Sequence, residues 1–269
     1  MKSLTELNTD RATFSIGKAL SDGWNLVSKS LGYYILGGII TVVITLVLSI
    51  IPIVGGIANQ VILAPCLMAG AVFVTWRISK GIGWADFGDM FKGFNFLSPI
   101  VVASVIQFAA TLILTVLFLL NYLGEIYELY KLAQGSGAYN NQEEIQAVVR
   151  HMFNPVSVLL FLLLMLVILF ITLIWAFKIH FIVIYKMQAW PAMEMSRKIA
   201  TNNLVPLIGF FLLMGLIIIV SALFCGIGLL FSLPLMIGAT YSIFAQITHC
   251  DQPDEINEEM FDFIADSKS

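Results

Sequence analysis

Four long stretches of this sequence contain no Asp, Glu, Lys or Arg, and they constrain the fold more than any other feature. A helix needs about 20 apolar residues to cross the hydrocarbon core of a bilayer, so each stretch has room for one or two spans. Only 12% of the 269 residues are charged, whereas soluble domains carry about 25%. The sequence therefore predicts an all-α, polytopic membrane protein. The charge-free stretches lie between Lys29 and Arg77, Lys92 and Glu125, Arg150 and Lys178, and Lys198 and Asp251.

The first and last stretches are each too long for one span and must contain a turn. As a single helix at about 1.5 Å per residue, the first would be about 70 Å long, roughly twice a bilayer core. Proline and glycine in residues 51–56, and glycines in residues 225–228, favour turns at these two places. Six spans result, at about 31–51, 56–77, 99–121, 155–177, 204–224 and 228–248.

The distribution of Lys and Arg predicts the orientation of these spans. If the N-terminus is cytoplasmic, twelve of the 14 cations lie inside and only Lys131 and Arg150 lie outside, as the positive-inside rule requires. We therefore expect a multi-pass protein of the bacterial inner membrane with both termini in the cytoplasm. Residues 1–30 form a cytoplasmic segment with an amphipathic helix, 31–250 the membrane domain, and 251–269 an acidic cytoplasmic tail.

A repeated pattern suggests that the six spans form three related hairpins, each preceded by a cytoplasmic amphipathic helix. Internal repeats are common in membrane folds. The N-terminal segment occupies the corresponding place before the first span, and its Ala19 to Leu31 shares a register with Ala192 to Leu204. The pattern of two Lys, a Trp and a Pro appears as Lys80, Trp84, Lys92 and Pro99, and again as Lys186, Trp190, Lys198 and Pro206.

These amphipathic segments are the predicted interface with membrane lipid. In the first, Ile16, Leu20, Trp24 and Val27 fall on one helical face, at the spacing of a 3.6-residue period. Helices of this kind lie in the headgroup plane. One interpretation is a collar that binds lipid, and the simpler one is a set of linker helices that anchor the next spans. The candidate interface residues are Lys80, Trp84, Lys92, Lys186, Trp190 and Lys198.

Two regions outside the spans could bind a protein partner. Residues 122–154 predict an outer helical hairpin, which could also pack only on itself and the spans. The tail holds seven acidic residues against Lys268, with Ile256, Met260 and Phe263 on one face. Because its charge opposes binding to an anionic leaflet, a folded tail would dock on basic cytoplasmic segments. The alternative is a disordered tail. Nothing indicates binding to nucleic acid.

No catalytic motif or cofactor motif is present. The three histidines, His151, His180 and His249, are scattered, and no set of metal ligands at a suitable spacing surrounds them. We therefore expect no enzyme, no cofactor and no metal. Lys178, near the end of the fourth span, should extend to the aqueous interface. Polar residues within the spans are the candidate sites, because such groups are costly in lipid: Gln107 near mid-membrane, Asn59, Gln60 and Gln246.

The segment Ala192 to Gln246 resembles a loose group of bacterial six-span membrane proteins. The likeness lies in an Ala-rich helix that enters a span and in the ending from Cys225 through Pro234 to Tyr241 and Phe244. The group includes YciC-like proteins and the membrane domain attached to some glycerophosphodiester phosphodiesterases. The resemblance implies the six-span fold and no catalytic residues.

Two functions remain open. The first is a non-enzymatic integral membrane protein that organises lipid or a protein partner. The second is a transporter or permease for a small or amphipathic compound, with a path lined by Gln107. A cavity that reaches Gln107 would favour transport, and a dry, packed bundle would favour the organiser.

Overall fold

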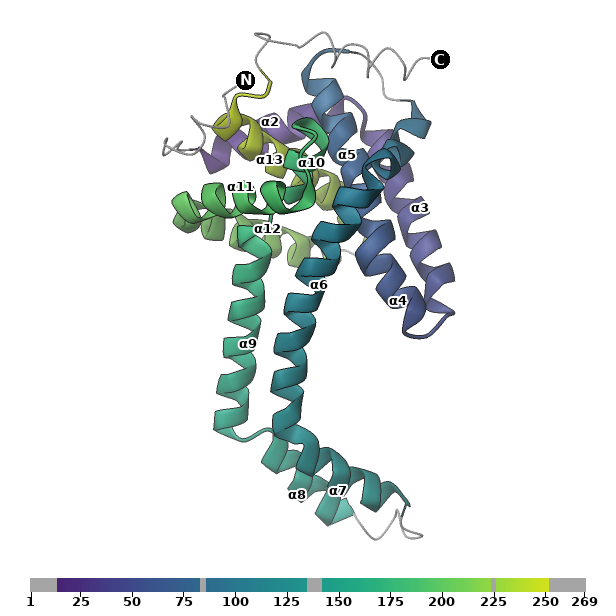
Figure 1. The fold of residues 1–269 in the computed structure, drawn as a ribbon, viewed down its shortest axis with the longest axis vertical. Helices are drawn as coiled ribbons and strands as arrows, with labels where there is room; N and C mark the ends of the chain where they lie inside the picture. The colour runs from purple at the N-terminus through teal and green to yellow at the C-terminus, as the bar shows by residue number, and fades with distance from the viewer. Residues whose placement is uncertain (1–13, 83–85, 135–141, 224–225, 252–269) are drawn as a thin grey trace. The chain divides into compact units, whose positions relative to one another are not determined.

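The chain is helical, as the computed structural model in Figure 1 shows. The structure describes residues 14–82, 86–134, 142–223 and 226–251, and this part of the chain contains no β-strand. Three predicted features lie outside the described residues: the first thirteen residues, Trp84, and the tail after Asp251.

Six helices are long and apolar enough to cross a membrane, which confirms the predicted all-α, six-span fold. Three of them are single helices, and the other three are runs of consecutive helices. They are α3 (Leu31–Ser49); Val54–Ser79, made of α4 (Val54–Ala58), the π-helix η1 (Asn59–Leu63) and α5 (Ala64–Ser79); Phe87–Leu132, made of the 3-10 helix η2 (Phe87–Phe96), α6 (Leu97–Leu119), η3 (Leu120–Tyr122) and most of α7 (Leu123–Gln134); Pro155–Ile184, made of α9 (Pro155–Ile174) and α10 (Lys178–Ile184); α12 (Leu204–Leu223); and α13 (Leu229–Thr248).

The outward faces of these helices are apolar, as a lipid environment requires. On α12, Leu212, Leu216 and Ile219 are each about three-fifths exposed and share one helical face. On α3, Val42 and Leu46 do the same. Soluble monomers rarely expose contiguous apolar surface on this scale. Six such helices make this a multi-pass membrane protein.

The chain divides into two compact units. The first contains residues 1–104 and 174–269, and the second contains Val105–Leu173. In the second unit, α7 contacts α8 (Gln142–Met152), so the hairpin predicted at 122–154 is helical on both sides. The rings of Phe118 on α6 and Phe161 on α9 lie 6.0 Å apart.

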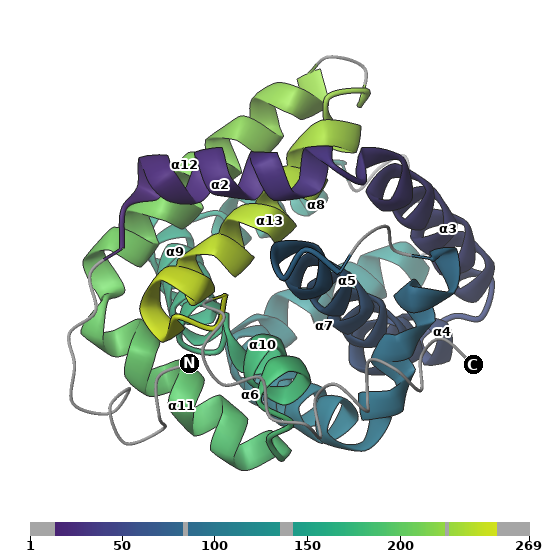
Figure 2. The same cartoon turned by 90° about the horizontal axis from the view of Figure 1, so that it is seen from above.

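Three inner helices and three surrounding helices form the centre of the first unit, which also contains α3, α4, η1 and α12. The inner triad consists of α5, α10 and α13, and the collar consists of α2 (Ile16–Ser28), η2 and α11 (Ala189–Asn202). Each inner helix packs on a collar helix: α5 on η2, α10 on α11, and α13 on α2. Figure 2 shows α2 and α11 lying around α5, α10 and α13. The first two contacts join neighbours in sequence, and the third closes the cycle between the two ends of the chain.

Each collar helix precedes one of the odd-numbered spans, as the repeat predicted. In order, α2 leads into α3, η2 into α6, and α11 into α12. The spans predicted at 31–51, 99–121 and 204–224 therefore each follow a helix of the collar. The central contact of the triad is aromatic, because the rings of Phe177 and Phe181 lie 6.0 and 5.0 Å from that of Phe244 on α13.

A serine from the collar supplies hydrogen-bond partners to the backbone at the break between α9 and α10. The Ser196 hydroxyl on α11 donates to the carbonyl oxygen of Ile174 at 2.9 Å. The Ser196 Oγ atom also accepts a hydrogen bond from the backbone N–H of Phe177 at 3.0 Å. Backbone groups freed by a break need partners in an apolar environment, and Ser196 supplies both. Beyond the break, Lys178 is buried (7% exposed), so the prediction that it extends to the aqueous interface is wrong.

Candidate functional site

Small residues bring the collar helices into backbone contact with the inner triad. Ala19, Gly23 and Val27 form the buried face of α2, and a Cβ on Gly23 would overlap the backbone of Gly238 and Ala239 on α13. On η2, Gly93 lies equally close to the backbone of α5. Close approach through small residues is a common way for helices to associate in membranes.

The packing of α2 leaves Trp24 on the outside, whereas Val27 is buried and Ile16 and Leu20 are half-buried. Trp24 is 39% exposed, although the sequence places it with Ile16, Leu20 and Val27 on one face. The other two collar helices also present one exposed aromatic side chain, Phe91 at 42% on η2 and Trp190 at 66% on α11. All three collar helices therefore have an inner face that packs on the triad and an outer face that carries an aromatic ring.

A buried carboxylate links η2 to α5. The Asp89 carboxylate accepts from the Arg77 guanidinium at 2.6 Å and lies 2.8 Å from the Lys92 ammonium. The side chains of Asp89 and Arg77 are 3% and 9% exposed. Lys92 also lies 5.7 Å above the ring of Phe73. The predicted interface residue Lys92 is thus held in an ion-pair network with Asp89.

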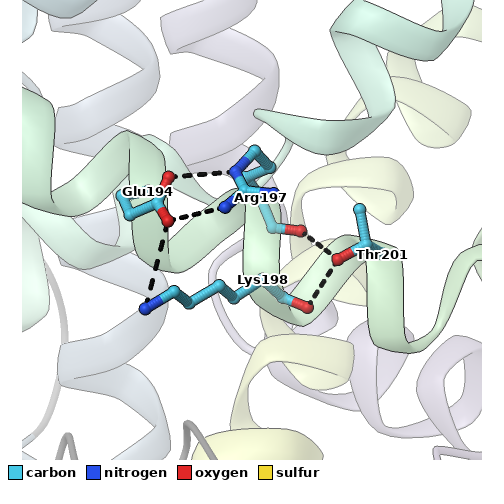
Figure 3. A network of polar contacts seen from close by, with 4 residues as sticks. All are labelled: Glu194, Arg197, Lys198 and Thr201. Atoms are coloured by element: carbon cyan, nitrogen blue, oxygen red, sulfur yellow. Dashed lines mark hydrogen bonds and ion pairs between the residues drawn. The ribbon is translucent and has the colours of Figure 1, made fainter.

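The charges on the outer side of α11 form an exposed network (Figure 3). Glu194 accepts from Arg197 at 2.6 and 2.9 Å and lies 3.9 Å from the Lys198 ammonium. The Arg197 guanidinium lowers the pKa of the Glu194 carboxyl. Exposed pairs of this kind add little stability. They leave one net positive charge on this turn of the collar, next to Trp190.

A hydrogen-bonded chain runs through the end of α13. The Tyr241 hydroxyl lies 2.6 Å from Ser79 Oγ at the end of α5 and 3.9 Å from Cys250 Sγ. Burial raises the pKa of the Cys250 thiol to about 11. Gln246 accepts the backbone N–H of Ser15 at 3.0 Å and so fixes the start of α2 on α13.

A polar cavity of about 570 Å³ lies beside this chain, between α2, α13 and the end of α5. Its floor is buried and includes Tyr241, Ser242 and Ala245. Both signs of charge line it, because α2 contributes a lysine and an aspartate one turn apart and the turn after α13 contributes a second aspartate. Its size falls in the range of small-molecule sites. The remaining lining residues are Lys18, Asp22, Asn25, Leu26, Ser79, Gln246, His249 and Asp251.

The three candidate polar residues of the spans in the first unit, Asn59, Gln60 and Gln246, do not come together. Gln246 lines the cavity. Asn59 accepts from the Thr45 hydroxyl at 3.2 Å, which joins α3 to the π-helical turn η1. Gln60 is exposed and Gln107 is half-buried in the second unit. Within the first unit, Asn59 and Gln246 thus make separate contacts between helices.

The candidate interface residues other than Trp84 lie at the edges of the collar. Lys80 follows the last residue of α5 and Lys186 lies in the turn before α11, with a positive φ of 52°. Lys186 is exposed, and Lys80 and Lys198 are half-buried. These cations are spread along the helix ends and do not form one cluster.

His180 is a fully buried titratable side chain of the triad. It is 1% exposed, and neither ring nitrogen has a hydrogen-bond partner. Its ring lies 5.1 Å from that of Phe244. Among the described residues, no three His, Cys, Asp or Glu side chains lie close enough together to hold a metal ion.

Sequence reasoning missed the residues that build the cavity and the buried ion pair. Lys18, Asp22 and Asn25 recur at the spacing of one helical face, which was a usable signal. Asp89 lies three residues before Lys92, which also permits a contact on a helix. The partners Arg77 and Tyr241 gave no local signal, because only the tertiary packing brings them to these sites.

Fold and surface together define a polytopic helical membrane protein with a collar of three helices packed on an inner triad. No protein-family model matches the chain, and no curated protein and no solved structure matches it significantly.

Proposed function

We propose that this protein is a non-enzymatic integral membrane protein of the bacterial inner membrane that organises lipid through its collar. The observation that carries the proposal is the exposed aromatic ring on each collar helix: Trp24, Phe91 and Trp190. Aromatic side chains are enriched at the interface between hydrocarbon and water, and amphipathic helices with such rings lie in the interface plane. Lys29 and Lys186, both exposed on or beside the collar, would add attraction to anionic headgroups.

Tryptophan fluorescence tests where the collar lies. Variants that keep a single Trp, at Trp24 or Trp190, would be reconstituted in vesicles that contain lipids with a quencher at headgroup depth. A third variant that keeps only Trp76, which is 4% exposed on α5, is the matched control. We expect strong quenching of Trp24 and Trp190 and weak quenching of Trp76. Quenching of Trp24 and Trp190 by aqueous iodide alone would place the collar in water and refute the proposal.

Orientation is the second part of the proposal. The bias of twelve Lys and Arg against two supports cytoplasmic N- and C-termini. Single cysteines would replace Ser136, in the predicted outer hairpin, and Ser267, in the tail. An impermeant thiol reagent added to intact cells should label position 136 and not position 267. Labelling of position 267 from outside would refute this topology.

Transport is the competing function, and it requires a path that reaches Gln107. The polar cavity of the first unit is lined by other residues, and so is a cavity of about 410 Å³ between α7 and α8. The aromatic packing at the centre of the triad also supports the organiser. A protein partner at the hairpin or the tail is compatible with the same fold.

A further inference from the structure

We propose that the polar cavity between α2 and α13 binds a zwitterionic headgroup that carries a primary ammonium and a phosphate, as phosphoethanolamine does. The proposal does not rest on lipid binding by the outer face of the collar, because the cavity lies on a different face of α2. It rests on the charges, the hydrogen-bonding groups and the place of the cavity in the fold.

The face of α2 that lines the cavity differs from the face that packs on α13 and from the face that carries Trp24. Lys18, Asp22 and Asn25 recur every three to four residues and line the cavity. The neighbouring face, with Gly23, packs on α13, and the next carries Trp24. One helix thus presents a charged face, a small-residue face and a bulky apolar face. The charged face lines the cavity, with Asp22 half-buried and Lys18 and Asn25 exposed.

The charges of the cavity match a ligand that has both signs. Lys18 provides one cation, while Asp22 and Asp251 provide two carboxylates. No ion pair within the described part of the chain joins these three to another side chain. Lys18 and Asp22 are one helical turn apart, where Cβ atoms are about 5–6 Å apart. That spacing suits a phosphate and an ammonium joined by a two-carbon linker.

The lining favours a primary ammonium over a quaternary one. Carboxylates and amide oxygens accept hydrogen bonds, and a primary ammonium donates three. Trimethylammonium groups donate none and are bound by cages of aromatic rings. Among the described lining residues the rings are Tyr241 and His249, and the Tyr241 hydroxyl is already engaged by Ser79 at 2.6 Å. The lining of the cavity therefore favours a ligand whose ammonium group donates hydrogen bonds.

The cavity is at the end of two spans. Ser79 is the last residue of α5, and His249 follows the last residue of α13. At this level a headgroup can enter from the bilayer, or a free phosphoethanolamine compound can enter from water. Both sources present the same chemistry to Lys18 and Asp22.

Calorimetric titration of the full-length protein with O-phosphoethanolamine tests the class of ligand. In nanodiscs of phosphatidylcholine and phosphatidylglycerol, we expect binding at least about tenfold tighter than that of phosphocholine, since a hydrogen bond to a charged group is worth that much. Asp22→Asn and Lys18→Met should each weaken binding by about tenfold. The matched controls are Asp86→Asn and Lys131→Met, which change exposed residues outside the cavity and should bind as the unmodified protein does.

A second arm distinguishes the sources. In nanodiscs that contain phosphatidylethanolamine, loss of binding of the soluble compound means that a lipid headgroup already fills the cavity. Unchanged binding in those nanodiscs means that the ligand comes from water. Two results with the unmodified protein would overturn the proposal, whatever the variants show. One is equal binding of phosphocholine and phosphoethanolamine, and the other is no binding of either in the nanodiscs of phosphatidylcholine and phosphatidylglycerol.

Discussion

Replacing Gly23 by alanine tests the contact that closes the ring of helices. An added Cβ would lie 2.6 Å from Ala239 Cα and 2.7 Å from the carbonyl carbon of Gly238. Non-bonded carbon atoms pack at about 3.5–4.0 Å, so the two helices would have to separate by about 1 Å. The atoms that would have to move belong to the backbone of α13, which cannot rotate away as a side chain can.

The expected magnitude combines two opposing effects. Overpacking a well-packed contact costs about 1–3 kcal/mol, and alanine improves helix propensity over glycine by about 1 kcal/mol. Gly23→Ala should therefore lower the free energy of unfolding by up to about 2 kcal/mol. Gly17→Ala is the matched control, because it lies on the same helix with nothing within 4 Å of the added Cβ. It should raise stability by about 0.5–1 kcal/mol.

The measurement is equilibrium unfolding in mixed micelles, followed by helical circular dichroism as the denaturing detergent is increased. The two alanine variants should shift the transition in opposite directions. If Gly23→Ala is as stabilising as Gly17→Ala, α2 does not pack backbone to backbone on α13, and the cyclic arrangement of the collar is wrong.

Three further predictions use the same assay. Asp89→Asn should cost about 3–5 kcal/mol, because it leaves Arg77 and Lys92 without the carboxylate that they share. Stability should fall by up to about 3 kcal/mol as the pH rises from 9 to 11, since burial raises the pKa of the Cys250 thiol to about 11 and the unfolded thiol loses its proton first; Cys250→Ala should lack this part of the decline. Gln107→Leu should cost no more than about 0.5–2 kcal/mol if this residue only bonds between helices, whereas unchanged stability with lost uptake would contradict that role.

The membrane fold could be predicted from sequence because it depends on the lengths of the charge-free segments along the chain. Charge-free runs set the six spans, and Pro52 with its neighbouring glycines set the first turn. The helices that precede the odd-numbered spans were also predicted, from the positions of Lys and Trp. These features are local in sequence, because each spanning helix must satisfy its own backbone hydrogen bonds within the bilayer.

The cavity and the ion pair could not be predicted in the same way. Periodicity on α2 marked Ile16, Leu20 and Trp24 as the important face, whereas the structure packs the face with Gly23. In lipid, a bulky apolar side chain is as well solvated on the outside of the helix bundle as on the inside. Small residues stabilise the contact between two helices, because they let the two backbones approach closely. The position of Lys178 was predicted wrongly because the helix breaks between α9 and α10, and Lys178 then starts a helix of the buried triad.

The contact between the first and last described helices has a consequence for how this protein is made. Ser15 and Gln246, which are hydrogen-bonded, stand 231 residues apart in sequence, whereas the contacts of α5 with η2 and of α10 with α11 join neighbours. During synthesis the latter two contacts can form as soon as their helices emerge. The face of α2 around Gly23 must wait, without its partner, until α13 has entered the membrane. A ribosome that stalls before α13 therefore leaves an unfinished chain with an unmatched helix at its very beginning, where chaperones and membrane proteases can recognise it.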